Sequence, residues 1–206
     1  MNSGQIEHGN LVLSWGVQLR SKQAGTESGD GFVLQRDGGR ILAAVIDGTG
    51  SGTQARKAAN TCIAALSDCG VHPLPICFQT CDDALANSRG AAMGLAMIDL
   101  TKCQLDWAAV GDIGGQLWQA RRPDSPRGIL QRGGTLGIQY SGIHQQQQDF
   151  RVGDLIIMAS DGVMRGFLAG ADINASASQV AEKTMASFGR DDDDAIVLAM
   201  KLDAAQ

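Results

Sequence analysis

Four aspartates stand at the ends of apolar runs, where their carboxylates could do chemistry together. Asp47 and Asp161 each end an apolar run and are followed by glycine, whereas Asp30 and Asp193 each precede one. In an antiparallel sheet, the end of one strand and the start of its neighbour lie at the same edge, so the four can converge. Crowded carboxylates raise one another's pKa unless a cation neutralises them, and Mg²⁺ and Mn²⁺ prefer oxygen ligands. A two-metal cluster can activate water and hold a phosphoryl oxygen.

The stretch around Asp47 organises the chain. Residues 41–46 are apolar without interruption, which predicts a buried strand, and glycines follow at 48, 50 and 52. Glycine allows positive φ and close approach of the backbone to a ligand. A simple Asp-Gly turn at the end of a strand is the alternative interpretation of this stretch alone.

Composition excludes several classes of protein. The chain has 206 residues, 44% hydrophobic and 19% charged, with a net charge of −5. This suits one globular domain over 1–206 and gives no basic surface for nucleic acid. No apolar run is long enough to span a membrane, and no signal peptide is visible at the N-terminus. We therefore expect a cytoplasmic protein; the oligomeric state is not specified.

The cysteines and histidines give no competing site. Five cysteines, an odd number, favour a reducing compartment. Cys69, His72, Cys77 and Cys81 could in principle hold zinc, but no C-x-x-C pair occurs, so buried structural thiols are the preferred interpretation. The remaining histidines match no motif, and we assign them no catalytic role.

The periodicity of apolar residues predicts strands, two helices, many strands, one helix and a final strand. The predicted strands cover 10–20, 32–35, 41–46, 92–99, 104–110, 115–120, 133–138, 144–150, 155–160 and 195–202. The predicted helices cover 52–69, 76–88 and 175–188, and the predicted loops include 21–31 and 121–128. This order indicates an α+β fold of antiparallel sheets packed together with helices outside.

Five stretches in this order resemble the metal-dependent protein phosphatase 2C (PPM) family. They are Ser28-Gly29-Asp30, Asp47-Gly48-Thr49-Gly50-Ser51-Gly52, Ala109-Val110-Gly111-Asp112, Ser160-Asp161-Gly162 and Asp193-Asp194-Ala195-Ile196-Val197. Two further stretches are similar to a bacterial subgroup that acts in sporulation and stress sigma-factor regulation. They are Gly134-Thr135-Leu136-Gly137-Ile138 and Val152-Gly153-Asp154. The compact length most resembles a stand-alone feedback serine/threonine phosphatase of the stressosome.

The resemblance implies a four-layer α-β-β-α sandwich with a two-metal centre of Mn²⁺ or Mg²⁺ at one edge. Asp47 would bridge both ions, the Gly48 carbonyl would ligate one, and Asp161 and Asp193 the other. Asp30 would act through a metal-bound water or at a weaker third ion. The nucleophile would be a metal-bound hydroxide, and the substrates phosphoserine and phosphothreonine on a STAS-domain or stressosome protein.

Several features depart from the family pattern. The arginine that grips phosphate in many members has no clear counterpart, since Arg20 and Lys22 lie about ten residues before Asp30. The four-aspartate run leaves Asp194 as the alternative to Asp193. Two other functions stay open: a phosphatase-like binding module with weak or no turnover, and a metal hydrolase of small phosphate esters.

Overall fold

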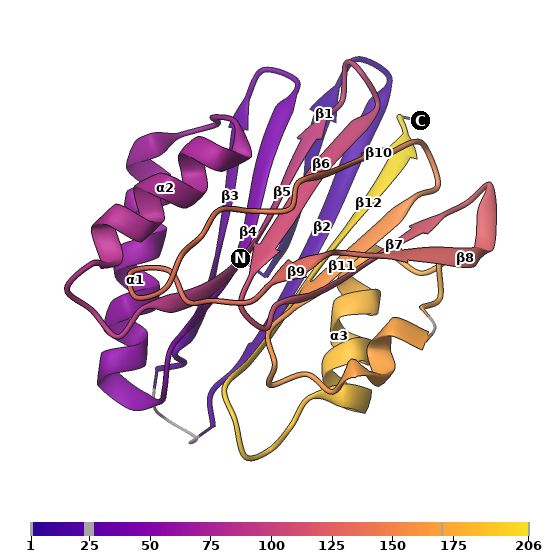
Figure 1. The fold of residues 1–206 in the computed structure, drawn as a ribbon. Helices are drawn as coiled ribbons and strands as arrows, with labels where there is room; N and C mark the ends of the chain where they lie inside the picture. Colours follow the sequence, from indigo (N-terminus) through magenta and orange to yellow (C-terminus); the bar gives the residue numbers. More distant parts are fainter. Residues whose placement is uncertain (1, 23–26, 170, 206) are drawn as a thin grey trace.

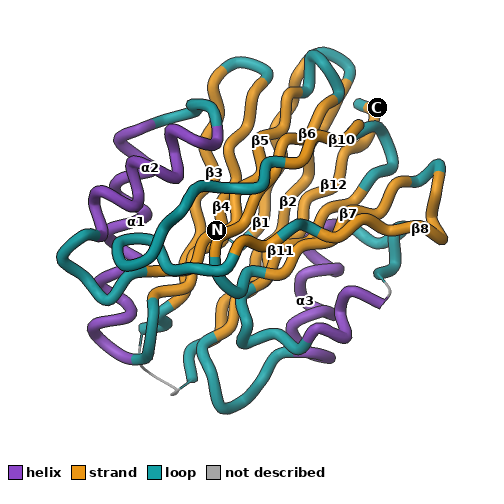
Figure 2. The backbone as a smooth tube through the Cα atoms, viewed as in Figure 1, coloured by secondary structure: helices purple, strands orange, loops and turns teal. Residues whose placement is uncertain are grey.

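The protein is a sandwich of two antiparallel sheets with helices on both outer faces (Figures 1 and 2). The computed structural model describes residues 2–22, 27–169 and 171–205. Helices α1 (Gly52–Cys69) and α2 (Leu74–Leu85) cover one sheet, and α3 (Ala177–Phe188) covers the other. The predicted four-layer α-β-β-α architecture is therefore confirmed.

The first sheet joins the two ends of the chain. Its strand order is β1-β2-β12-β11-β7-β8, all antiparallel. The strands are β1 (Ser3–His8), β2 (Leu11–Arg20), β12 (Ala195–Ala204), β11 (Leu155–Ala159), β7 (Gly114–Gln119) and β8 (Arg122–Gly128). Because β11 and β12 are neighbours, the end of one and the start of the other lie at the same edge.

The second sheet carries the stretch around Asp47. Its strand order is β10-β6-β5-β4-β3, with the short β9 pairing in parallel with β6. The strands are β3 (Asp30–Asp37), β4 (Arg40–Gly48), β5 (Ala91–Asp99), β6 (Gln104–Val110), β9 (Gln131–Arg132) and β10 (Gln146–Asp149). Alternate residues of β4 pack between the two sheets and against α1 and α2, so both of its faces are covered, which explains its uninterrupted apolar run.

Three apolar layers hold the sandwich together. One lies between the sheets around Trp107 and Phe150, one between α1, α2 and the second sheet, and one under α3. Helix α1 buries one stripe, namely Ala55, Ala58, Ala59, Cys62 and Leu66. It ends at Gly70, whose φ of 78° is accessible to glycine at no steric cost. The predicted helix at 52–69 is therefore correct to the residue.

The structure corrects the prediction in several segments of the chain. The segment predicted as a surface loop at 121–128 is the edge strand β8, which tolerates its two prolines because one side has no strand partner. The segment at 133–138 is not a strand and forms only isolated bridges through Thr135 and Leu136. Strand β1 and the short β9 had no distinct apolar pattern. Residues 23–26 of the predicted loop at 21–31 lie outside the described residues.

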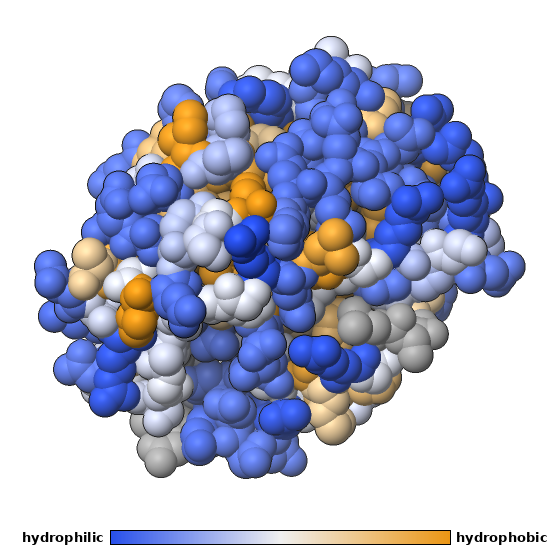
Figure 3. All heavy atoms as spheres, in the orientation of Figure 1, coloured by the Kyte–Doolittle hydropathy of each residue, from blue (hydrophilic) through white to orange (hydrophobic). Residues whose placement is uncertain are grey.

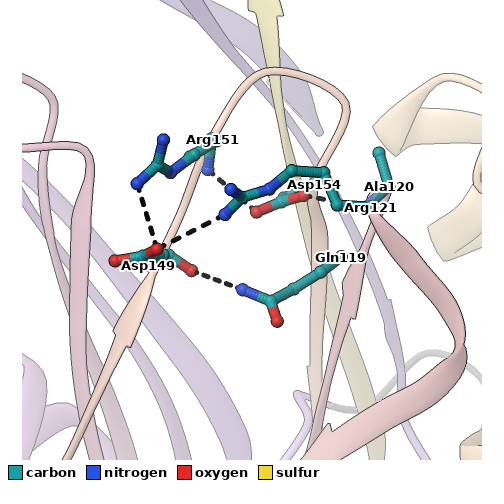
Figure 4. Close-up of polar contacts among 6 residues, drawn as sticks. All are labelled: Gln119, Ala120, Arg121, Asp149, Arg151 and Asp154. Atoms are coloured by element: carbon teal, nitrogen blue, oxygen red, sulfur yellow. Dashed lines mark hydrogen bonds and ion pairs between the residues drawn. The ribbon is translucent and has the colours of Figure 1, made fainter.

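Polar contacts stabilise the turn after β7 and the turn before β11 (Figure 4). Both turns lie at the opposite end of the first sheet from Asp161. The buried Asp154 carboxylate accepts hydrogen bonds from the backbone N–H groups of Ala120 (2.8 Å) and Arg151 (2.9 Å). The Asp149 carboxylate pairs with Arg121 (3.3 Å) and Arg151 (3.1 Å). Asp154, part of a stretch quoted for the family resemblance, is thus a structural residue at the opposite end of β11 from Asp161.

One face of the molecule can be judged by its hydropathy. The face seen in Figure 3 is largely hydrophilic, with hydrophobic side chains scattered singly rather than gathered in one large patch. None of the helices in the described part of the chain is both long and apolar enough to cross a lipid bilayer.

Candidate metal centre

Asp30 and Asp47 face each other at one edge of the second sheet. They are direct partners in the antiparallel register of β3 and β4, because the hairpin at Asp37–Arg40 pairs the start of one strand with the end of the other. Asp30 is only 1% exposed, whereas Asp47 is partly exposed. Two carboxyl groups in direct contact with little water cannot both be ionised at low cost.

Ser160 anchors Asp30 from the other sheet. Its hydroxyl donates a 2.6 Å hydrogen bond to Asp30 Oδ2 and accepts one of 3.1 Å from the backbone N–H of Ile196. Ser160 follows β11, and Ile196 lies near the start of β12. This chain of hydrogen bonds joins the acidic edges of the two sheets, so the carboxylates from both sheets converge.

Asp47, Asp161 and Asp193 line one cavity of about 240 Å³. Asp161 follows β11, and Asp193 precedes β12, so the antiparallel pairing of these strands places both at this edge. Exposed Asp112, from the turn between β6 and β7, also lines the cavity. The convergence expected from strand ends is therefore present in the structure.

Asp193 and Asp194 are distinguished by their partners. The Asp194 carboxylate is buried and accepts hydrogen bonds from the backbone N–H groups of Lys22 and Gly29, each at 2.8 Å. Asp193 is less buried, and among the described residues its carboxylate accepts one hydrogen bond, from the N–H of Asp194 to Oδ1 at 3.0 Å. Asp194 thus ties the loop before β3 to the start of β12, and Asp193 has the freer carboxylate.

Two glycines let the backbones approach closely here. A Cβ atom at Gly48 would lie 2.0 Å from the carbonyl oxygen of Ala55, in the first turn of α1. A Cβ atom at Gly162 would lie 1.8 Å from the carbonyl oxygen of Asp194. Each glycine directly follows one of the clustered aspartates, so the Asp-Gly pairs reflect close packing as well as turn formation.

The electrostatics of this cluster favour protonation. Burial, followed by repulsion from Asp30, Asp161 and Asp193, raises the pKa of Asp47 to about 9. Burial also raises the pKa of Asp30 to about 7, against the lowering effect of the Ser160 hydrogen bond. Desolvation at the cavity wall and then Asp193 raise the pKa of Asp161. A cation at this edge would remove these penalties together.

The donor set fits a hard divalent cation, because every side-chain donor around the cavity is an oxygen. Among the residues that the structure describes, no three carboxylate, thiol or imidazole groups are already arranged around one metal position. The Asp47 carboxyl interacts with both Asp30 and Asp161, and the Asp194 carboxylate is held by backbone N–H groups. A cation bound at this edge would replace the contacts that the Asp47 carboxyl makes with Asp30 and Asp161.

Sequence reasoning did not find the roles of Ser160 and Asp194. Ser160 lay within a quoted motif, but nothing in the sequence indicated a hydrogen bond to a residue 130 positions away. Asp194 was the alternative ligand, and its backbone partners are visible only in the fold. The histidines His8 and His144 lie on the surface and make contacts outside the acidic edge, with Thr101 and Arg132 respectively.

The fold and its acidic edge define a protein of the phosphatase 2C-like class. Residues 37–203 match the family described as Stage II sporulation protein E (SpoIIE). The chain therefore belongs to the SpoIIE family.

Individual relatives agree with this assignment. Phosphoserine phosphatase RsbX of Bacillus subtilis (strain 168) is 25% identical over 109 residues, which are 53% of this chain and 54% of RsbX, about half of its length. A solved structure from the bacterial stressosome, described as a modular system adapted to control secondary messenger signalling, is 28% identical. It has a TM-score of 0.83, over 92% of this chain and 99% of that one. RsbX in complex with magnesium has the same fold, at 19% identity and a TM-score of 0.81 over 97% and 99% of the two chains.

Proposed function

We propose that this chain, as one catalytic unit over 1–206, is a metal-dependent protein serine/threonine phosphatase. It hydrolyses phosphoserine or phosphothreonine on a bacterial signalling protein, a STAS-domain or stressosome component. The observation that carries the proposal is the convergence of Asp47, Asp161 and Asp193 on one cavity, with Asp30 directly behind Asp47. Membership of the SpoIIE family and the similarity to a phosphoserine phosphatase support it. The cytoplasm is the proposed compartment, because all five cysteines are free thiols.

The proposed cofactors are two ions of Mn²⁺ or Mg²⁺, with a third at Asp30 as the weaker alternative. Asp47 and the Gly48 carbonyl would hold one ion, and Asp47 with Asp161 and Asp193 the other. The freer carboxylate of Asp193 supports its choice over Asp194, which already accepts two backbone hydrogen bonds. Bound divalent cations supply Lewis acidity, which favours deprotonation of water and offsets the charge of a phosphoryl group.

The chain's own residues position the reactants. In the reaction, a water oxygen bonds to phosphorus, the ester bond to the side-chain oxygen breaks, and that oxygen leaves with a proton from the water. The cluster in its free form disfavours a phosphate dianion, because its carboxylates repel negative charge. Asp30, fixed by the Ser160 hydroxyl at 2.6 Å, would orient water beside Asp47, which lines the cavity. The rigid strand ends limit how far each carboxylate can move.

The test is phosphate release with Mn²⁺, with and without excess chelator. The substrates are p-nitrophenyl phosphate, phosphorylated STAS-domain proteins and free nucleotides. We expect activity on the phosphoproteins, its loss on chelation, and at least about a 10³-fold loss in Asp47→Asn. Asp124→Asn, an exposed carboxylate change on β8, is the matched control.

Each alternative outcome identifies a different function. Full activity in excess chelator would contradict the metal-dependent mechanism. Turnover of nucleotides but not of phosphoproteins would indicate a hydrolase of small phosphate esters. Binding of a phosphoprotein without turnover would indicate a binding module.

A further inference from the structure

A second cavity opens directly beside the acidic one. Its volume is about 510 Å³, within the range of ligand-binding clefts. Asp112 and Asp161 line both cavities, so the two adjoin each other. We call the second cavity the side groove. It runs along the ends of β7 and β8 to the short 3-10 helix η1 (Arg165–Ala169).

The side groove carries positive charge next to the acidic cavity. Arg165 and Arg190 both line it. The Arg165 guanidinium lies 3.6 Å from the Asp112 carboxylate, but both side chains are more than 70% exposed (75% and 72%), so this pair is weak and easily exchanged. A negatively charged ligand can therefore compete for Arg165.

Arg190 is the better placed of the two cations. Its backbone N–H donates a 2.8 Å hydrogen bond to the carbonyl of Gly162, which fixes the start of its side chain beside Asp161. Within the described residues its guanidinium has no hydrogen bond or ion pair, although its charge lowers the pKa of Asp161. A free guanidinium at the junction of the two cavities is suited to bind a phosphate.

The other wall of the side groove is apolar. Ile129, Val163 and Phe167 are buried behind it, while Met164 is 46% exposed. Methionine adapts its shape to different apolar partners, which suits a binding surface. Gly128 leaves the groove open at β8, because it carries no side chain. The groove thus combines cations, an apolar wall and direct access to the acidic cavity.

A third cavity, beside β8, is a less suitable docking site. It measures about 600 Å³ and is lined by several arginines on and beside β8, but it shares no lining residue with the acidic cavity. Asp149 already pairs with two arginines there (Figure 4). Charged residues on an edge strand also protect it from pairing with other chains.

We propose that the side groove holds the segment of the substrate protein that flanks the phosphorylated residue. Arg190 contacts the phosphate, and the exposed Met164 contacts an apolar side chain next to the phosphorylated residue. This inference rests on the proposed function, since it names the surface by which the same site would recognise a phosphoprotein. It assigns to Arg190 the phosphate contact that no residue near Asp30 clearly supplies.

Kinetics with a small and a large substrate test the two contacts separately. The substrates are p-nitrophenyl phosphate and a phosphoserine peptide with leucine beside the phosphoserine, both with Mn²⁺. We expect Arg190→Ala to raise KM about tenfold or more for both substrates, because it removes a charge-assisted hydrogen bond to the phosphate. Arg190→Lys should recover part of this loss. The effect should fall mainly on KM rather than kcat.

A substitution that fills the groove tests the apolar contact. A Cβ atom at Gly128 would lie 3.6 Å from Gln116 Oε1 and 3.9 Å from the Gly115 carbonyl, so a side chain can begin there with ordinary van der Waals contacts, and Gly128→Leu is the variant chosen. We expect it to raise KM about tenfold for the peptide and to leave KM for p-nitrophenyl phosphate unchanged. Ser125→Leu, which adds the same side chain at an exposed position of β8 outside the groove, should change neither.

A binding measurement separates this inference from the proposed function. Fluorescence anisotropy follows a labelled phosphoserine peptide and its unphosphorylated form with Mn²⁺. Weaker phosphopeptide binding in Arg190→Ala and Gly128→Leu supports the side groove as the binding site, even if the wild-type protein shows no turnover. Absence of turnover would refute only the proposed phosphatase activity. Unchanged binding and unchanged KM in both variants would overturn the groove even if the wild type is an active phosphatase.

Discussion

Replacing Asp47 by asparagine should stabilise the metal-free protein, and the gain should grow with pH. Burial and three neighbouring carboxylates raise the pKa of Asp47 from 3.8 to about 9. The folded protein therefore keeps this proton at pH values where the unfolded chain has released it. This contribution to stability is fully present below pH 3.8 and is lost as the pH rises toward 9.

The size of the effect follows from the same values. Each pH unit between 3.8 and about pH 7 corresponds to about 1.36 kcal/mol of stability. The loss of stability that Asp47 causes near neutral pH is therefore at most roughly 4 kcal/mol. Asp47 is partly exposed, and an asparagine amide must also be desolvated. We therefore expect Asp47→Asn to raise the free energy of unfolding by about 1–3 kcal/mol near neutral pH.

Denaturant unfolding in excess chelator measures this difference. We expect wild type and Asp47→Asn to converge near pH 4 and to differ most near pH 8, while Asp124→Asn follows wild type throughout. Saturating Mn²⁺ should reverse the order, because ligand binding to the folded state stabilises wild type more than the variant. A metal-free Asp47→Asn that is less stable than wild type near pH 8, or a difference independent of pH, would refute the reasoning.

Three further predictions concern the surroundings of Asp47. Ser160→Ala should lower the free energy of unfolding by about 1–3 kcal/mol, because it leaves the buried Asp30 carboxyl without its 2.6 Å partner. Denaturant unfolding measures this difference, and unchanged stability would contradict the role of Ser160. Gly162→Ala should lower the free energy of unfolding by about 2 kcal/mol or more in the same assay, because its Cβ would lie 1.8 Å from the Asp194 carbonyl oxygen. Unchanged stability would mean that β12 can shift to make room. Asp30→Asn should retain a measurable rate of p-nitrophenyl phosphate hydrolysis, whereas Asp47→Asn should not. Equal losses of activity in the two variants would mean that Asp30 is as important for catalysis as Asp47.

Local patterns in the sequence were enough to predict the elements that carry the site. The apolar run at 41–46 is fully buried in β4, and the stripe of small apolar residues with Gly70 predicted α1 correctly. The position of each aspartate at the end of a run predicted that the acidic edge would form. These features depend on short-range periodicity and on the geometry of antiparallel pairing, which a single sequence contains.

Only the tertiary structure decided how the individual carboxylates are used. Asp193 and Asp194 are chemically identical neighbours, and they differ because the fold brings the N–H groups of Lys22 and Gly29 to one of them. Ser160 reaches Asp30 because the two sheets pack face to face, and β8 is a strand because β7 offers it an edge. Such contacts join residues far apart in the chain, so no local pattern of side chains encodes them, and the packing of the sheets determines which polar atoms meet.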